Sequence, residues 1–192
     1  MPQPGGLCDG VPRWKDTFID NSEDYFFTFN YTSVLERIYR VPSNHILHIH
    51  GGLYPYCDEP PILGHGNVKK IEEYREKAER AAEEYDEGKE SIYNAVANYY
   101  ERTFKNTNEC MAFRGKFFRQ LTGVNNVEII GHSFGEVDMP YFTYLKCCIS
   151  KNAKWKFYYH SSEDYNAAKK AVNELELDIR DYEILLSDCF WQ

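Results

Sequence analysis

Three absences narrow the classes of protein to which this 192-residue chain can belong. No apolar run approaches the roughly 20 residues of a membrane-spanning helix, and no signal-peptide core follows the N-terminus. No concentrated basic patch is present, and the net charge of −8 opposes a nucleic-acid backbone as the main partner. We therefore expect a cytoplasmic protein that neither enters a membrane nor binds nucleic acid.

The six cysteines include no CxxC pair, which disfavours a structural zinc site. In a reducing compartment they are expected to be free thiols, several of them buried. The apolar and charged fractions of 43% and 27% are ordinary, and the 16% share of aromatic residues predicts a packed interior.

Predicted strands and helices alternate along the chain after an irregular segment over residues 1–20. Apolar runs between turn residues indicate strands, and apolar residues three and four apart indicate helices. This alternation favours an α/β fold, a three-layer parallel sheet with helices on both faces, in one domain over 1–192. The predicted strands cover about 25–30, 45–50, 126–131, 154–159 and 181–186, and helices are expected near 35–39, 110–121, 139–149 and 162–175.

A charged helical hairpin is predicted within residues 67–105, inserted between the second and third strands. Ile71, Tyr74 and Ala78 follow helical spacing with charged residues between them. Gly88 is expected to separate the two helices. Such an insertion is more typical of a lid or a packing arm than of a catalytic element.

Polar residues follow three of the predicted strands. Asn30 follows the first strand, His50 the second and Ser133 the third. Because the carboxyl ends of parallel strands meet at one edge, where ligands bind in open α/β sheets, we expect these residues on one shared rim.

The segment Gly131–Gly135 matches the G-x-S-x-G turn of serine hydrolases. A triad needs an acid and then a histidine downstream, but His160 is the only later histidine and Asp138 directly follows the turn. The favoured alternative is a turn whose glycines let a ligand approach, with Ser133 donating a hydrogen bond. Asp138 would then cap the next helix or bind a ribose hydroxyl.

His48 and His50 lie two residues apart in the second predicted strand, on the same face. A metal site is disfavoured, because the nearby acids Asp58 and Glu59 fall in a proline-rich loop, and no metal is expected. His50 is the better candidate for a general base, since imidazole titrates near neutral pH. The alternative is a buried histidine bonded to a loop carbonyl.

Asn30 ends its strand with an amide that both donates and accepts hydrogen bonds, which suits ribose hydroxyls or a carboxamide. The alternative is an asparagine that accepts loop amides in a turn.

Together these segments resemble the bacteriophage abortive-infection AbiH family, whose members are phage-resistance factors of bacteria. The resemblance spans about residues 25–160, and the ordered set is more specific than any one motif. The set comprises Phe27-Thr28-Phe29-Asn30-Tyr31-Thr32 with Leu35-Glu36, His48-Ile49-His50-Gly51, Gly64-His65-Gly66, and Ile130-Gly131-His132-Ser133 with Asp138.

The same order more distantly resembles the sirtuin-like NAD-binding fold. This resemblance implies that Asn30 holds the nicotinamide ribose and that His50 acts as base on a ribose hydroxyl, which makes both catalytic. The cofactor-binding set that it implies is Thr28, Asn30, Gly131, His132, Ser133 and Asp138.

Two departures from these families limit the implied activity. Residues 1–24 lack the Gly-Asn-Gly-Phe-Asp-type turn that would receive a pyrophosphate, which implies a member without its first β–α unit and with impaired NAD cleavage. Thr32 stands where sirtuins carry an acid, and the zinc-ribbon cysteines are absent, which disfavours deacylation. The competing hypothesis is a non-catalytic module that binds or senses a ligand, or a truncated remnant.

Overall fold

The computed structural model describes residues 23–53, 60–66 and 68–191. The irregular segment predicted over 1–20 therefore lies outside the described residues, as do Asp58 and Glu59 of the proline-rich loop. Among the described helices, none is both long and apolar enough to cross a bilayer.

The structure is α/β with parallel strands, but the strands form two small sheets in the described part of the chain, not the single sheet predicted. In the first sheet, β1 (Phe26–Thr28) pairs with β2 (Ile46–His48). The second sheet has the order β3-β4-β5, with β3 (Asn126–Ile130), β4 (Lys154–Tyr159) and β5 (Tyr182–Leu186).

Aromatic side chains, packed around α7 (Met139–Cys148), join the two sheets. Phe27 packs edge-on against Tyr141 of α7, and Phe29 stacks on Phe142 of the same helix, with ring centroids 5.5 Å apart. Phe142 also contacts the turn that follows β3. Side-chain packing, rather than a continuous ladder of backbone hydrogen bonds, therefore holds β1 near β3.

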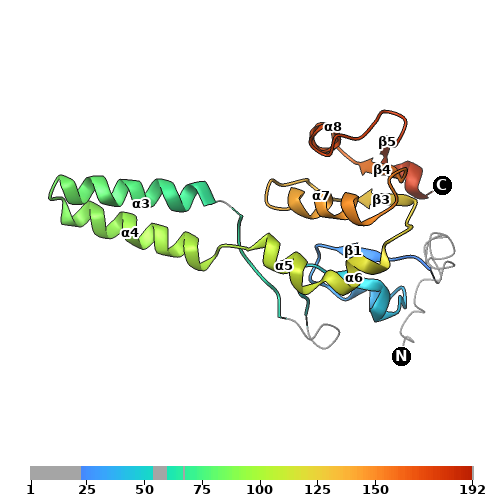
Figure 1. Ribbon diagram of the computed structural model, residues 1–192, viewed down its shortest axis with the longest axis horizontal. Coiled ribbons are helices and arrows are strands. Elements are labelled where there is room, and N and C mark those ends of the chain that lie inside the picture. The colour runs from blue at the N-terminus through green and yellow to red at the C-terminus, as the bar shows by residue number, and fades with distance from the viewer. Residues whose placement is uncertain (1–22, 54–59, 67, 192) are drawn as a thin grey trace, which may run out of the picture.

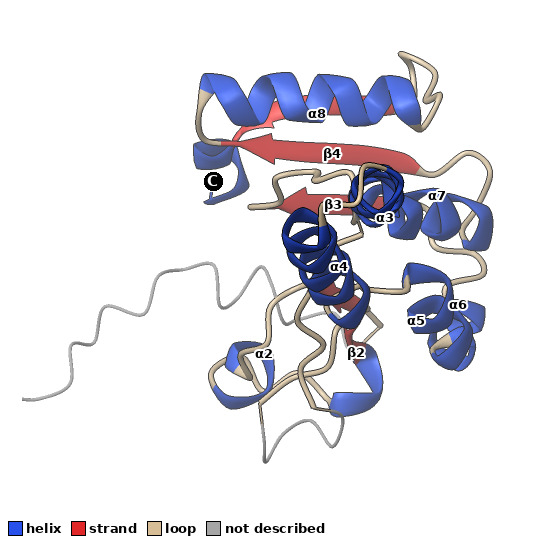
Figure 2. Cartoon of the chain, turned by 90° about the vertical axis from the view of Figure 1, so that its left-hand side faces the viewer, coloured by secondary structure: helices blue, strands red, loops and turns tan. Residues whose placement is uncertain are grey.

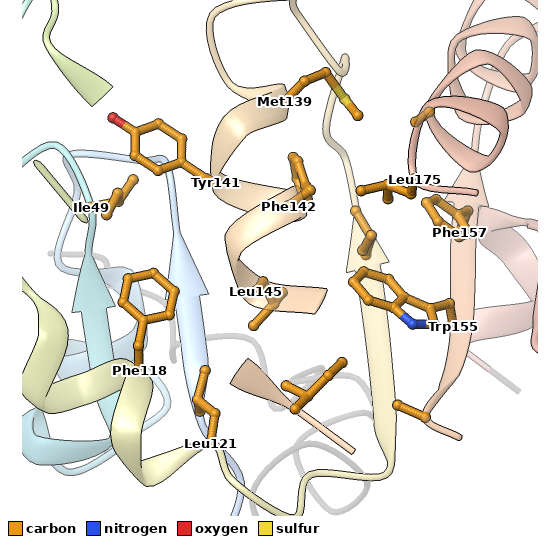
Figure 3. Packing of buried hydrophobic residues seen from close by; sticks show 14 of the residues in the cluster. Ile49, Phe118, Leu121, Met139, Tyr141, Phe142, Leu145, Trp155, Phe157 and Leu175 are labelled. Carbon is orange, nitrogen blue, oxygen red and sulfur yellow. The ribbon is translucent and has the colours of Figure 1, made fainter. Parts of the chain in front are cut away.

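The buried core lies on both sides of α7 (Figure 3). Its largest fully buried side chains are Tyr141, Phe118, Phe157 and Ile49, which come from four different elements or their ends. The helix α8 (Ser162–Glu174) runs along β4 (Figure 2), and its buried residues Ala168, Ala171 and Val172 belong to the same core as α7. Its N-terminus carries the capping box of Ser161 and Asp164.

A helical hairpin formed by α3 (Val68–Glu83) and α4 (Glu87–Arg102) extends away from the rest of the chain (Figure 1). Small side chains occupy its seam: Ala78 and Ala81 of α3 and Ala97 of α4 are buried. Arg75 bridges the two helices through an ion pair of 2.8 Å with Glu101.

Two predicted helix boundaries were wrong. Gly88 lies inside α4, and the hairpin turns earlier, where Tyr85 takes a positive φ of 58° and Asp86 caps α4. The single helix predicted over 110–121 is two helices that meet at Arg114, α5 (Thr107–Phe113) and α6 (Gly115–Gln120). Short segments that complete the fold are α2 (Val34–Arg37) and the 3-10 turns η1 (Ser43–His45) and η2 (Ser187–Trp191).

The four cysteines within the described residues are free thiols, as predicted, but only one of them is fully buried. Cys110 lies in the core, whereas Cys147 and Cys189 are exposed and Cys148 is half-buried.

Candidate functional site

The carboxyl ends of β1, β2 and β3 meet around one aromatic side chain. Phe29 follows β1, and its ring centroid lies 5.7 Å from that of His50, which follows β2. The same ring lies 4.3 Å from His132, in the turn that follows β3. The structure thus brings His50 to the same edge as the turn that contains Ser133.

A single carboxylate faces two imidazoles at this edge. His50 Nε2 lies 3.4 Å from Asp138 Oδ1, although the two residues are 88 positions apart in the sequence. His132 Nε2 lies 3.6 Å from the other oxygen, Oδ2. The Asp138 side chain is 19% exposed, so the two histidines partly shield its charge from water.

Only one of the two ring nitrogens of His50 faces a partner among the described residues. Its side chain is only 3% exposed, and within the described residues its Nδ1 is buried without a hydrogen-bond partner. When Asp138 is ionised it accepts a hydrogen bond from Nε2, which leaves the lone pair on Nδ1. This is the arrangement in which a carboxylate orients a general base.

His132 is held as a single tautomer by its own turn. The Phe134 N–H donates to His132 Nδ1 at 2.8 Å, so Nδ1 carries no proton and Nε2 does. Phe134 itself adopts a φ of 53°, an unusual value for a residue with a side chain, so the chain turns sharply at this hydrogen bond. Burial lowers the pKa of His132, while the charge of Asp138 opposes that shift.

Asp138 does not cap α7 with its side chain, which was one of the two predicted roles. It occupies the N-cap position, but its carboxylate turns toward the histidines instead.

The predicted ribose-binding residues lie at the same edge with different degrees of exposure. Asn30 and Ser133 are exposed, and Gly131 takes a positive φ of 64° with open space where a Cβ would lie. Thr28 Oγ1 accepts a hydrogen bond of 3.1 Å from the Asn30 N–H, so it shapes the turn. The Asn30 side chain is therefore presented at the surface by a fixed backbone.

His48 has two structural partners that the sequence pattern does not predict. Its Nε2 lies 2.7 Å from Glu36 Oε1, and its Nδ1 lies 2.8 Å from the carbonyl oxygen of Asn30. His48 thus fixes the backbone on which Asn30 is carried, and it does not share a site with His50. Glu36 lies on a separate short helix, α2, so no local pattern links it to His48. The one sequence signal for this pair was an acidic residue shortly before a strand that carries histidines.

A comparison with protein families finds a match for this chain. The model of a family described as "Bacteriophage abortive infection AbiH" matches residues 10–159. The chain belongs to the AbiH family. The match includes every site residue discussed above and implies a role in phage abortive infection. No curated protein and no solved structure matches the chain.

In this AbiH family member, residues 60–66 connect the site to the helical hairpin. The Ile62 N–H donates to the His50 carbonyl at 2.7 Å, and the Tyr31 hydroxyl donates to the Ile62 carbonyl at 3.0 Å. Further along, the His65 N–H donates to the Thr103 carbonyl at the base of α4, at 3.0 Å. The Gly64-x-Gly66 pattern was the available sequence signal for this close packing.

Neighbouring residues pack so close to Gly64 and Gly66 that neither position has room for a side chain. A Cβ on Gly64 would lie 2.1 Å from the Thr103 carbonyl oxygen, and one on Gly66 would lie 2.4 Å from Val137 of the turn before α7. A separate cavity of about 470 Å³ lies at the other end of α7, lined in part by Lys146, Cys147 and Leu175, and none of the site residues lines it.

Proposed function

We propose that this AbiH family member acts in abortive infection by cleaving NAD at the shared rim, with His50 as the general base. The contact between His50 and Asp138 is the observation that carries the proposal. A buried imidazole with one nitrogen against a carboxylate and the other without a partner in the described residues is suited to accept a proton.

The proposed reaction breaks the bond between the nicotinamide nitrogen and C1′ of the ribose. The electron pair of that bond stays with nicotinamide, which leaves as a neutral ring, while positive charge develops on the ribose. His50 Nδ1 draws the proton of a ribose hydroxyl, which stabilises this charge, and water then adds at C1′. The products are nicotinamide, ADP-ribose and one proton released to the solvent.

The other rim residues would bind the substrate. The exposed Asn30 amide is proposed to hold the nicotinamide ribose, while Gly131 and Ser133 lie beside the rest of the dinucleotide. In this proposal the two sheets correspond to two parts of a sirtuin-like, Rossmann-like scaffold. Because the His50 side chain is only 3% exposed, substrate can reach it only after a local movement, and we propose that residues 60–66, whose Ile62 N–H donates to the His50 carbonyl, make that movement.

Incubation of the purified full chain with NAD, followed by chromatography for free nicotinamide, tests the proposal. We expect nicotinamide release that His50→Ala abolishes. His45→Ala is the matched control, because His45 lies at the opposite end of β2 and stacks on Tyr25. Circular dichroism would verify that both variants are folded.

Release that persists in His50→Ala would exclude His50 as the base, and two further outcomes decide against NAD cleavage itself. If calorimetry detects NAD binding but no nicotinamide is released, the protein is a module that binds or senses the nucleotide. If NAD neither binds nor is cleaved, the nucleotide proposal fails as a whole. In bacteria, loss of phage protection with His50→Ala but not with His45→Ala would tie the same site to the antiphage role.

A further inference from the structure

His132 occupies the far side of the Asp138 carboxylate from His50. One oxygen of the carboxylate faces His50 Nε2 at 3.4 Å, and the other faces His132 Nε2 at 3.6 Å. Because the Phe134 N–H occupies His132 Nδ1, the single N–H of the neutral His132 ring, at Nε2, points toward Asp138. The three side chains therefore form a His–Asp–His row with a fixed direction.

We propose that His132 is a positioning residue that acts on His50 through Asp138. His132 offers one N–H to Oδ2, and this holds the carboxylate so that Oδ1 faces His50. His50 then keeps its proton on Nε2 and presents Nδ1 as the base. Contacts of 3.4–3.6 Å are longer than good hydrogen bonds, and such catalytic contacts commonly shorten when substrate binds.

The surroundings of Asp138 favour this role. Its ion-pair partners within the described residues are the two histidines, and the hydroxyls of Tyr31 and Tyr141 also feel its charge, which contributes to their raised pKa. Burial is the larger cause of the raised pKa in both tyrosines, so they stay neutral. The orientation of the carboxylate is thus set mainly by the two imidazoles.

A merely structural role for His132 is the competing explanation, because its ring also packs against Phe29, Phe134 and Phe142. Two variants separate these roles. His132→Asn places an amide oxygen near the position of Nδ1 and retains an acceptor for the Phe134 N–H, but it has no donor that reaches Asp138. His132→Gln places an amide N–H near the position of Nε2 and retains that donor. Both variants remove the ring.

The decisive measurement is the tautomer of His50, read from long-range ¹H–¹⁵N correlation spectra of the labelled full chain at pH 8. We expect the Nε2–H form in the wild type and in His132→Gln, and a mixture that includes the Nδ1–H form in His132→Asn. If the two variants behave alike, or if wild-type His50 carries its proton on Nδ1, the proposal is wrong. Should either variant fail to fold, Asp138→Asn must shift His50 toward Nδ1–H, because an amide N–H would then face Nε2.

The activity measurement rests on the proposed function, whereas the spectra do not. Where NAD is cleaved, we expect His132→Asn to lower kcat about 10–100-fold with little change in KM, the scale of other supporting-residue losses, and His132→Gln to restore most of it. If the wild type shows no NAD cleavage, the function proposed above fails, and the tautomer of His50 still decides the role of His132.

Discussion

Glu36 Oε1 lies 2.7 Å from His48 Nε2, and this pair ties α2 to the end of β2. The other ring nitrogen of His48 lies 2.8 Å from the carbonyl oxygen of Asn30, so both nitrogens face acceptors. The side chains of Glu36 and His48 are 10% and 6% exposed, so water competes little for either group.

Replacement of Glu36 by Gln should therefore destabilise the protein. We expect a loss of about 1.5–3 kcal/mol in the free energy of unfolding, the range for a hydrogen bond to a charged group. Urea unfolding followed by circular dichroism measures it. The control is Glu73→Gln on α3, where an exposed carboxylate pairs with two lysines and the midpoint should hardly change. Equal midpoints for the two variants would contradict the structural role of Glu36.

The Gly64→Ala variant should also be less stable, because residue 64 has a φ of 157° and a Cβ would meet backbone at 2.1 Å. We expect a cost of about 1–3 kcal/mol, as for overpacked sites. The matched control is Gly88→Ala in α4, where the new Cβ makes an ordinary contact of 3.5 Å and stability should stay equal or rise by up to about 1 kcal/mol. A thermal shift assay compares the two. Gly64→Ala with an unchanged Tm would mean that residues 60–66 do not pack as described.

The protein should lose stability as the pH falls below about 6.5, in part through His132. Burial lowers the folded-state pKa of His132, so the unfolded chain takes up its proton first, near the ordinary value of about 6.5. Above about pH 7 both states are neutral and this contribution is constant. Urea midpoints between pH 5 and 8 should fall less steeply on acidification in His132→Asn, which cannot titrate. Parallel pH curves for the two proteins would exclude His132 as a cause.

His50 and Asn30 should differ in the kinetics of NAD cleavage. His50→Ala removes proton transfer and should lower kcat about 10²–10⁴-fold with little change in KM. Asn30→Ala should raise KM as well as lower kcat, since its amide is proposed to contact the ribose directly. Steady-state nicotinamide release at several NAD concentrations separates the two patterns. A change in KM alone for His50→Ala would show that His50 only binds substrate.

Local patterns in the sequence were sufficient to predict most of the elements. In β4, buried Trp155 and Phe157 alternate with more exposed residues, and the predicted range 154–159 is confirmed. The helix predicted near 162–175 is confirmed as α8, and Ser161 and Asp164 form a capping box at its start. The helical hairpin is confirmed as well, but its turn was misplaced because Gly88 tolerates helical backbone and the strain falls on Tyr85.

The sequence by itself also determined which polar residues follow strand ends, since Asn30, His50 and Ser133 lie at such positions in any parallel α/β arrangement. Only the tertiary structure decided their partners. The contacts of Asp138 with His50 and His132, and the contact of Glu36 with His48, depend on how α2, α7 and the two sheets pack. His50 and Asp138 are 88 positions apart in the sequence, and the burial of aromatic side chains such as Phe29 brings them together. No local periodicity of the sequence encodes a contact over that separation.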